Sequence, residues 1–156
     1  MGGCRNGRSG LGRGRVVVAD VVGTAQNPLQ FKLISRATAI NNFIDTGPAG
    51  PSTGDLYVFT DQVFRPSAPS TPIGTFEGHC ILFDPSTAHW DCSVVTTLPD
   101  GTIRGDGALT FVEGSKNRGA ITGGTERYRN ARGEGLVELG PFMGPHTLSY
   151  SVILSP

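Results

Sequence analysis

The sequence lacks an excess of charge of either sign. Charged residues make up 17% of the chain, and 13 Lys and Arg balance 13 Asp and Glu, so the formal net charge is zero. Proteins that bind nucleic acid or anionic membranes usually carry a basic excess on at least one face. We therefore expect neither nucleic acid nor a membrane among the partners of this protein.

Long apolar runs are also missing. No run approaches the roughly 20 residues that a membrane-spanning helix needs, and the N-terminus has no apolar stretch of the secretory type. We expect a cytoplasmic protein if the chain starts at Met1, and a secreted one if the true start lies upstream. Residues Met1–Arg15 are rich in Gly and Arg without periodicity, which indicates a flexible tail. Residues 16–156 have the size of one domain.

Cysteine is scarce, with three residues that form neither a disulfide framework nor a CxxC pair. Cys80 and Cys92 flank a predicted turn at Asp84–Ala88, so they could lie opposite each other on paired strands. In an oxidising compartment they would bond, whereas in the cytoplasm they would stay thiols. A zinc site with His79 and His89 is not expected, because His79 and Cys80 are strand neighbours that point to opposite faces. We expect no metal and no organic cofactor.

A helical period is absent from the whole sequence. Short β-rich runs alternate instead with turn clusters at intervals of roughly ten residues, a spacing typical of all-β sandwiches and barrels. Eight strands joined by short reversals favour a closed antiparallel barrel, because closure removes the sheet edges. The predicted strands are Val16–Val22, Phe31–Asp45, Asp55–Phe64, Gly74–Phe83, His89–Leu98, Thr102–Val112, a broken run over Ala120–Glu138, and Thr147–Leu154.

Alternation along these strands sorts the side chains onto two faces. In the run Gly74–Phe83, one face carries Phe76, Gly78, Cys80 and Leu82, and the other carries Thr75, Glu77, His79, Ile81 and Phe83. Both faces include apolar groups, so either could be the interior. An apolar outer face would indicate packing between subunits.

Two segments resemble a known family. The run GDLYVFTDQVF, Gly54–Phe64, is similar to the GDL-x-x-FT signature of plant allene oxide cyclases, and AITGGTERYRNARGE, Ala120–Glu134, is similar to the GGTG-containing segment of dirigent proteins and bacterial cyclase-like barrels. Gly74–Phe83 matches the third strand of the cyclases, with Cys80 at the pocket cysteine. The resemblance covers about Phe31–Leu154 and implies an eight-stranded antiparallel barrel of the allene oxide cyclase-like, dirigent-like family, of a bacterial type. Because related barrels often assemble as dimers or trimers, the resemblance also implies a homo-oligomer, a dimer or a trimer.

The sequence departs from this family at three informative positions. Where allene oxide cyclases have a glutamate near the end of the first long strand, this chain has Asn41 and Asn42. Asp61 takes the place of an asparagine that helps to hold a pocket water, and Glu126 takes the place of the last GGTG glycine. Allene oxide cyclase activity itself is therefore not expected. A shared barrel leaves the chemistry open, because the resembling families include cyclases, dirigent proteins that steer radical coupling, and polyketide ring-closing enzymes.

Asp61 and Tyr57 are the predicted catalytic residues. A carboxyl group that faces an apolar interior has a raised pKa, which suits it to donate a proton or accept a hydrogen bond during ring closure. The alternative is a solvated strand-end aspartate near the barrel mouth. The predicted substrate-binding residues are Phe59, Phe76, Cys80, Trp90, Tyr150 and Asn42. The aromatic ones could equally fill a packed core, and Cys80 could be inert packing.

Together these features predict a cyclase- or isomerase-like barrel that binds an extended hydrophobic, polyketide- or lipid-like substrate and guides its intramolecular ring closure in specialised metabolism. The main alternative is a dirigent-like or ligand-binding barrel without turnover, possibly secreted. A third is a barrel whose interior is merely a packed core. Catalysis requires an interior large enough for a ligand and at least one polar group inside it.

Overall fold

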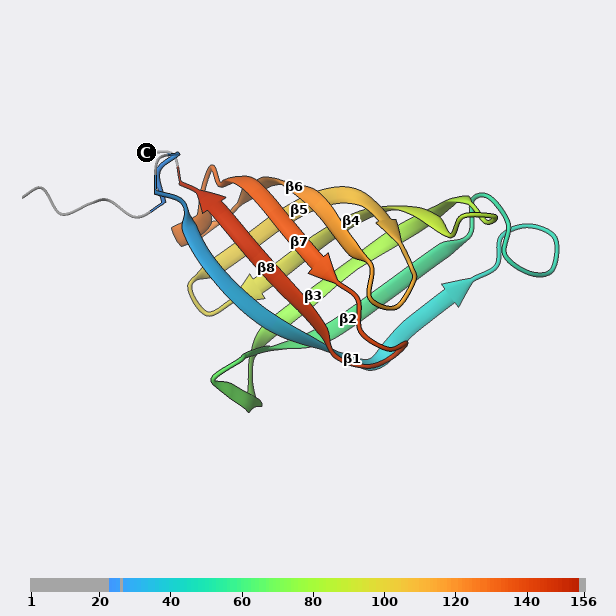
Figure 1. Ribbon diagram of the computed structural model, residues 1–156, viewed down its shortest axis with the longest axis horizontal. Coiled ribbons are helices and arrows are strands. Elements are labelled where there is room, and N and C mark those ends of the chain that lie inside the picture. Colours follow the sequence, from blue (N-terminus) through green and yellow to red (C-terminus); the bar gives the residue numbers. More distant parts are fainter. Residues whose placement is uncertain (1–22, 26, 155–156) are drawn as a thin grey trace, which may run out of the picture.

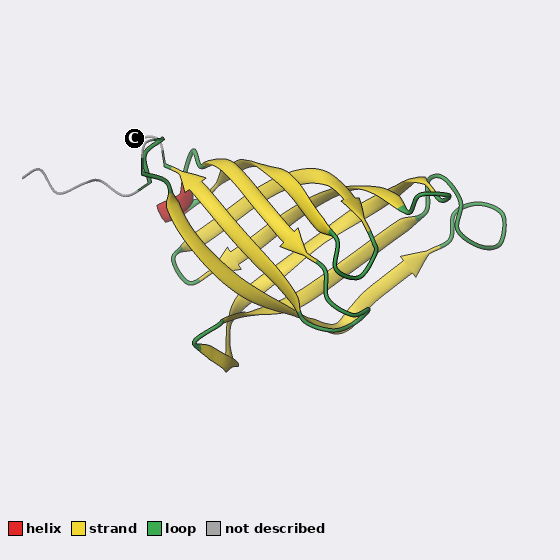
Figure 2. Cartoon of the chain, viewed as in Figure 1, coloured by secondary structure: helices red, strands yellow, loops and turns green. Residues whose placement is uncertain are grey.

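The computed structural model describes residues 23–25 and 27–154, and within them the chain forms one closed barrel of eight antiparallel strands (Figures 1 and 2). Each strand pairs with the next in the sequence, and the last pairs with the first. The all-β barrel predicted from the sequence is confirmed. The strands are β1 (Leu29–Ile44), β2 (Leu56–Arg65), β3 (Ala68–Asp84), β4 (His89–Leu98), β5 (Gly101–Thr110), β6 (Lys116–Gly124), β7 (Arg132–Glu138) and β8 (His146–Ile153), with a short 3-10 helix, η1 (Glu126–Tyr128), between β6 and β7.

The barrel has eight strands, as predicted, but they are not formed by the same eight segments of the sequence. The broken run over Ala120–Glu138 divides into two paired strands, β6 and β7, separated by η1. The predicted strand Val16–Val22 lies outside the described residues. β3 begins at Ala68 instead of Gly74, because the proline-containing segment continues the β2–β3 hairpin as a bulged extension beyond the barrel wall (Figure 1). Proline is tolerated there, since the segment needs few ladder hydrogen bonds.

The end of the barrel that carries η1 is closed by side chains. Tyr128 is 3% exposed and its hydroxyl donates a hydrogen bond of 3.1 Å to Asp100, whose other carboxylate oxygen accepts one of 2.8 Å from Arg127. Gly124 is needed beside it, because a Cβ at that position would lie 2.4 Å from the Thr102 carbonyl oxygen. Glu126, which replaces a glycine of the family motif, takes the left-handed conformation with φ 51, a conformation that favours glycine.

The interior is divided into a packed half and a hollow half. Near the closed end, fully or almost fully buried aliphatic side chains fill the barrel: Leu33, Val63 and Val152. The predicted alternation of β3 is confirmed, with Phe76 and Cys80 buried inside and Glu77 exposed outside. Packing at one end therefore leaves the opposite end as the part of the barrel that can hold a guest. In the described part of the chain, no helix has the length and apolarity to cross a membrane.

Candidate active site

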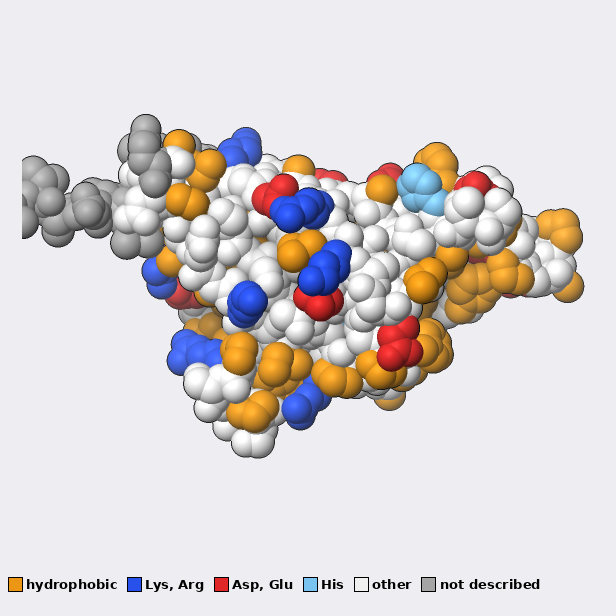
Figure 3. Space-filling model, viewed as in Figure 1, with side chains coloured by type: hydrophobic (Ala, Val, Ile, Leu, Met, Phe, Trp, Pro, Cys, Tyr) orange, Lys and Arg blue, Asp and Glu red, His pale blue; other side chains and the backbone are white. Residues whose placement is uncertain are grey.

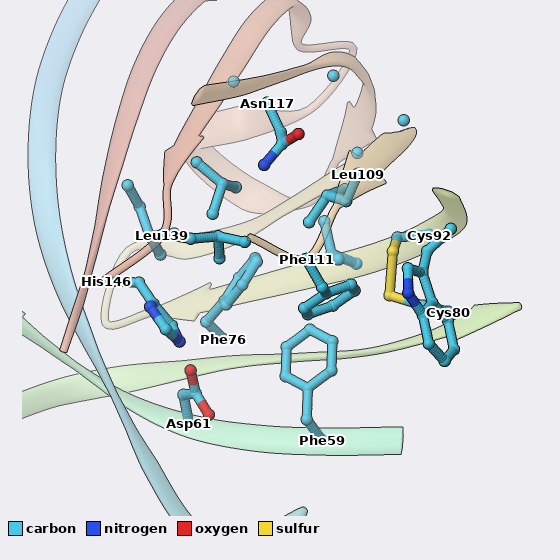
Figure 4. Close-up of a pocket in the computed structure, with 18 of the residues that line it drawn as sticks. Phe59, Asp61, Phe76, Cys80, Cys92, Leu109, Phe111, Asn117, Leu139 and His146 are labelled. Atoms are coloured by element: carbon cyan, nitrogen blue, oxygen red, sulfur yellow. A yellow bond between two sulfur atoms is a disulfide. The ribbon is translucent and has the colours of Figure 1, made fainter. Parts of the chain in front are cut away.

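A cavity of about 540 Å³ occupies the end of the barrel opposite η1 (Figure 4). Its mouth is bordered by the end of β1 and by the β5–β6 and β7–β8 loops, through the partly or largely exposed side chains of Phe43, Val112, Phe142 and Met143. Figure 3 shows apolar side chains exposed around this end of the molecule. A volume of this size is in the range of pockets that enclose drug-sized ligands.

Aromatic rings form one wall of the cavity. Each ring lies 5.3 to 6.0 Å, centroid to centroid, from the next in the series Phe43, Trp90, Phe111, Tyr57, Phe59 and Phe76. The series runs from the mouth into the interior, and four of its members were predicted from the sequence. Rings locked against one another keep their orientation, so this wall presents a fixed apolar shape to a guest.

A disulfide forms part of the same cavity lining. Cys80 of β3 and Cys92 of β4 are directly paired in register, and their sulfur atoms are bonded (Figure 4). Of the two alternatives, a disulfide or two free thiols, the structure contains the disulfide. Neither residue therefore presents a thiol to the cavity. Cys80 therefore contributes an apolar, cross-linked part of the cavity wall.

Asp61 lies inside the cavity, on β2, and is 4% exposed. Burial raises the pKa of its carboxyl group, and the smaller influences of the Ser35 hydroxyl, the His146 imidazole and the Asn41 amide act in the opposite direction. The alternative of a solvated aspartate at the barrel mouth does not apply. A desolvated carboxyl with a raised pKa is a stronger base than a solvated one and is suited to exchange a proton with a bound substrate.

His146 faces Asp61 from the start of β8 (Figure 4). Its Nδ1 accepts a hydrogen bond of 3.0 Å from the Gly140 backbone N–H, which places the proton of the neutral ring on Nε2. Burial lowers the pKa of His146, and the nearby Asp61 partly opposes this shift. Neither residue takes part in the ion pairs found among the described residues.

His146 was missed in the sequence. The predicted strand began one residue later, at Thr147, yet the same alternation that places Leu148 and Tyr150 inside also places His146 inside. Phe111 and Leu109 were missed in the same way, although they share a face with Gly105 and Gly107 on a predicted strand. Strand alternation carried to the strand ends is the signal that could have found them.

The two tyrosine hydroxyls of the cavity have protein partners. Tyr57 donates a hydrogen bond to the side-chain carbonyl of Asn41, and the Tyr150 and Thr96 hydroxyls lie 2.5 Å apart at the inner end of the cavity. Burial raises the pKa of Tyr150 to about 12 and also raises the pKa of Tyr57. Both phenols are therefore protonated at neutral pH and serve as fixed polar points in an apolar wall.

Asn42 does not line the cavity, in contrast to its predicted role. It is exposed on the outer face, where it pairs with Val58, whereas Asn41 pairs with the inward Phe59. Asn41 shares its face of β1 with Ala37, which also lines the cavity, and the bulge preserves this alternation because it adds two residues, with 38–40 opposite Thr60 alone. Asn41 is thus the asparagine of the cavity. The other predicted binding residues, Phe59, Phe76, Cys80, Trp90 and Tyr150, all line it.

Metal-ligating side chains do not gather anywhere in residues 23–25 and 27–154, where no group of three His, Cys, Asp or Glu could hold an ion. Arg132, which belongs to the family-like motif, donates hydrogen bonds of 2.8 and 2.7 Å to the carbonyls of Thr122 and Ala131. This arginine braces the loop around η1.

Comparison with known families places the barrel. Residues 35–141 match the model of the allene oxide cyclase barrel like domain. The chain belongs to this family. No curated protein matches the sequence. Membership confirms the resemblance seen in the two sequence motifs, and it accounts for the strand order and the closed barrel.

Several solved structures share the barrel of this allene oxide cyclase-like chain. A pyocyanin demethylase has a TM-score of 0.70 and 21% identity, covering 80% of this chain and 99% of its own. The exo-specific intermolecular Diels–Alderase AbnU has a TM-score of 0.61 and 17% identity, covering 80% and 95%. The pterocarpan synthase dirigent protein PsPTS1 has a TM-score of 0.62 and 16% identity, covering 82% and 95%. At these identities the likeness concerns the fold, so the function has to be argued from the cavity.

Proposed function

We propose that the barrel binds one extended, mostly apolar molecule, polyketide- or lipid-like, and guides its intramolecular ring closure in specialised metabolism. The observation that carries the proposal is the cavity of about 540 Å³, which combines a continuous aromatic wall with a single deeply buried carboxyl group, that of Asp61. A merely structural barrel would fill this volume with its own side chains.

Confinement can supply most of the rate enhancement. A flexible chain loses many rotational states when it folds its reacting ends together, and a rigid cavity makes that ordering part of binding. Intramolecular reactions with well-oriented groups gain up to about 7–11 kcal/mol in this way. The rings of Phe59, Phe76 and Phe111 would hold the apolar chain, while Asp61 and the tyrosine hydroxyls would orient its polar end.

The structural neighbours support a cyclase-like role without naming a substrate. Diels–Alderases such as AbnU and the AbmU enzyme of Streptomyces koyangensis use this barrel, as do dirigent proteins. The match to AbmU covers 81% of this chain, with 18% identity and a TM-score of 0.62. A pyocyanin demethylase on the same fold is a reminder that other chemistry is compatible with the barrel.

Binding in the cavity is tested by filling it. A Cβ added at Gly135, which lines the cavity with negative φ, would meet no atom within 4 Å, so Gly135→Leu should place its side chain in the hollow without disturbing the wall. Gly123→Leu is the matched control, because its Cβ also meets open space but Gly123 does not line the cavity. Fluorescence of Trp90, the one tryptophan of the chain, reports binding of the apolar probe N-phenylnaphthylamine.

We expect Gly135→Leu to weaken probe binding at least about tenfold, since lost apolar burial of a few methylene groups is worth more than 1.4 kcal/mol. Gly123→Leu should bind like the parent protein. Equal binding by both variants would place the probe outside the cavity and refute the proposed site.

Ring closure without a co-reactant leaves the molecular mass unchanged. Deletion of the gene in its native host should therefore replace one metabolite with an open-chain isomer of the same mass, and the purified protein should convert that isomer to the closed product. Binding of the isomer without conversion would favour the alternative of a dirigent-like carrier.

A further inference from the structure

We infer that Asp61 and His146 work as a pair on a substrate that contains a hydroxyl nucleophile and a conjugated carbonyl, and that the ring closes by conjugate addition of the hydroxyl oxygen. This inference rests on the proposed function and specifies its substrate class. A pericyclic closure would need shape alone, whereas this reaction needs a base and a hydrogen-bond donor on the two sides of one cavity.

The two side chains come from strands on either side of β1. Asp61 of β2 is paired with Ala37, and His146 of β8 is paired with Ser35, two residues earlier on the same strand. Both side chains point into the cavity and toward each other (Figure 4). Ser35, the strand partner of His146, has a fully buried hydroxyl whose oxygen lacks a hydrogen-bond partner of standard geometry within the described residues. Asp61 and His146 thus bring a carboxyl group and an imidazole together in a cavity whose walls are mostly apolar.

The orientation of His146 is fixed by the loop that precedes it. Because the Gly140 N–H occupies Nδ1, the neutral imidazole carries its proton on Nε2 and can only donate there. Burial lowers the pKa of this ring, which keeps it neutral at physiological pH. A neutral N–H donor can stabilise an enolate oxygen by a hydrogen bond without giving up its proton.

Asp61 supplies the complementary function. Its carboxylate can accept the hydroxyl proton, and burial makes it a stronger base than a solvated aspartate. The Tyr57 hydroxyl donates to Asn41, and the Tyr150 hydroxyl is hydrogen-bonded to Thr96, so those phenols are less available for the same task. We therefore assign the proton transfer to Asp61 and the hydrogen-bond donation to His146.

The reaction balances without any co-reactant. The substrate O–H bond breaks as Asp61 takes the proton, and the oxygen forms a C–O bond to the β-carbon of the enone. The electron pair of the C=C bond moves to the carbonyl oxygen, where His146 Nε2–H donates to the enolate. Asp61 then returns the proton to the α-carbon, which restores the carbonyl and the ionised carboxylate. Substrate and product are isomers.

The test uses ortho-hydroxychalcone, an extended apolar hydroxy-enone that closes to flavanone, with the reaction run in deuterated water. We expect the protein to accelerate closure and to place one deuteron on a single face of the α-carbon, because one fixed carboxyl group delivers it. Asp61→Asn should slow closure at least about tenfold while Trp90 quenching shows that the probe still binds.

Two variants of His146 separate donation from loop positioning. In His146→Asn the amide oxygen can replace Nδ1 as acceptor for Gly140 while no donor remains at the Nε2 position, whereas in His146→Gln the amide nitrogen can occupy the Nε2 position. We expect His146→Asn to lose at least about tenfold in rate and His146→Gln to lose less, with probe binding unchanged in both.

The inference is overturned if the parent protein binds ortho-hydroxychalcone without accelerating its closure, or if Asp61→Asn is as active as the parent protein. Cycloaddition of a linear decatrienone by a protein that leaves bound ortho-hydroxychalcone unchanged would overturn it too, yet would leave the proposed cyclase function intact. Failure of the proposed function would be recognised by a different result, namely equal binding of N-phenylnaphthylamine by Gly135→Leu and Gly123→Leu.

Discussion

The phenol of Tyr57 donates a hydrogen bond to the side-chain carbonyl of Asn41, and this bond ties β2 to the bulge of β1 at the side of the cavity. The Asn41 amide nitrogen donates in turn to the Thr38 carbonyl, with a distance of 2.9 Å. Thr38 also uses its hydroxyl within the bulge, donating to the Thr60 carbonyl over 2.5 Å. The bulge is therefore held by side-chain hydrogen bonds at the side of the cavity.

We expect this hydrogen bond to contribute about 1 kcal/mol to stability, as other partly buried hydrogen bonds between neutral groups do. Tyr57→Phe, Asn41→Leu and the double variant form a thermodynamic cycle that urea unfolding can measure. The coupling energy should be about 1 kcal/mol. Additive effects of the two substitutions would mean that the pair contributes nothing as a unit.

Asp61 should cost the protein stability at neutral pH. Its folded pKa lies above the unfolded value because of burial, so the folded state binds the proton more tightly than the unfolded state does. Stability then falls as pH rises from the unfolded pKa through the folded one. Asp61→Asn should therefore unfold at a higher temperature than the parent protein at pH 7, and this advantage should shrink at acid pH.

Thermal unfolding monitored by circular dichroism between about pH 3 and 8 measures this dependence. Asp91→Asn is the matched control, since Asp91 is an exposed aspartate on a neighbouring part of the barrel. A stabilising effect of Asp61→Asn alone, together with lost activity, would indicate that the buried carboxyl is kept for function. Loss of stability at pH 7 would contradict the assignment of a raised pKa.

Most of the barrel could be predicted because each strand shows an alternation of inward and outward side chains, and each reversal contains residues typical of turns. The prediction of β4 as His89–Leu98 matches both ends of the strand, since Pro and Gly follow it closely. The boundaries of β3 and of the β6–β7 pair could not be predicted in the same way. They depend on hairpin bulges and on η1, which tertiary contacts of Tyr128 and Asp100 stabilise.

The candidate site shows the same limit. Asp61, Phe59 and Phe76 follow from regular alternation within strands, and the same alternation carried on from Ala37 would have placed Asn41, and not Asn42, in the cavity, because the bulge adds two residues and keeps the parity of β1. His146 lies at a strand end, where a shift of one residue in the predicted boundary removes it from the pattern. The face of a residue within a strand was therefore predictable, whereas the bounds of the strand were not.

The GDL segment, residues 54–56, fixes the loop between β1 and β2 through hydrogen bonds of Asp55. The carboxylate accepts from the backbone N–H groups of Thr46 (2.9 Å) and Ser52 (2.7 Å) and from both hydroxyls of those residues, which fixes the loop between β1 and β2. These hydrogen bonds lower the pKa of Asp55. Gly54 precedes it with φ 100, a conformation that suits glycine.

Because the pKa of Asp55 is lowered in the folded state, its contribution to stability depends on pH in the opposite direction to that of Asp61. The stabilisation by Asp55 is present above its unfolded pKa and is lost as pH falls through the lower folded pKa. Asp55→Asn should therefore lower the unfolding temperature at neutral pH, because one amide oxygen cannot accept all four hydrogen bonds. The difference from the parent protein should vanish in strong acid. A constant difference at all pH values would show that shape, and not charge, is what the loop requires.

The disulfide between Cys80 and Cys92 should be measurable by thiol titration in denaturant, where reduction should raise the number of reactive thiols by two. Because the bridge closes a short loop, its removal in the Cys80→Ala, Cys92→Ala double variant should cost about 2 to 3 kcal/mol of unfolding free energy. Both residues line the cavity, so this variant should also bind N-phenylnaphthylamine less tightly. Cys4→Ser is the control and should change neither property. If reduction releases no additional thiols, the two cysteines are not bonded in the protein, and any loss of stability in the double variant would reflect packing alone.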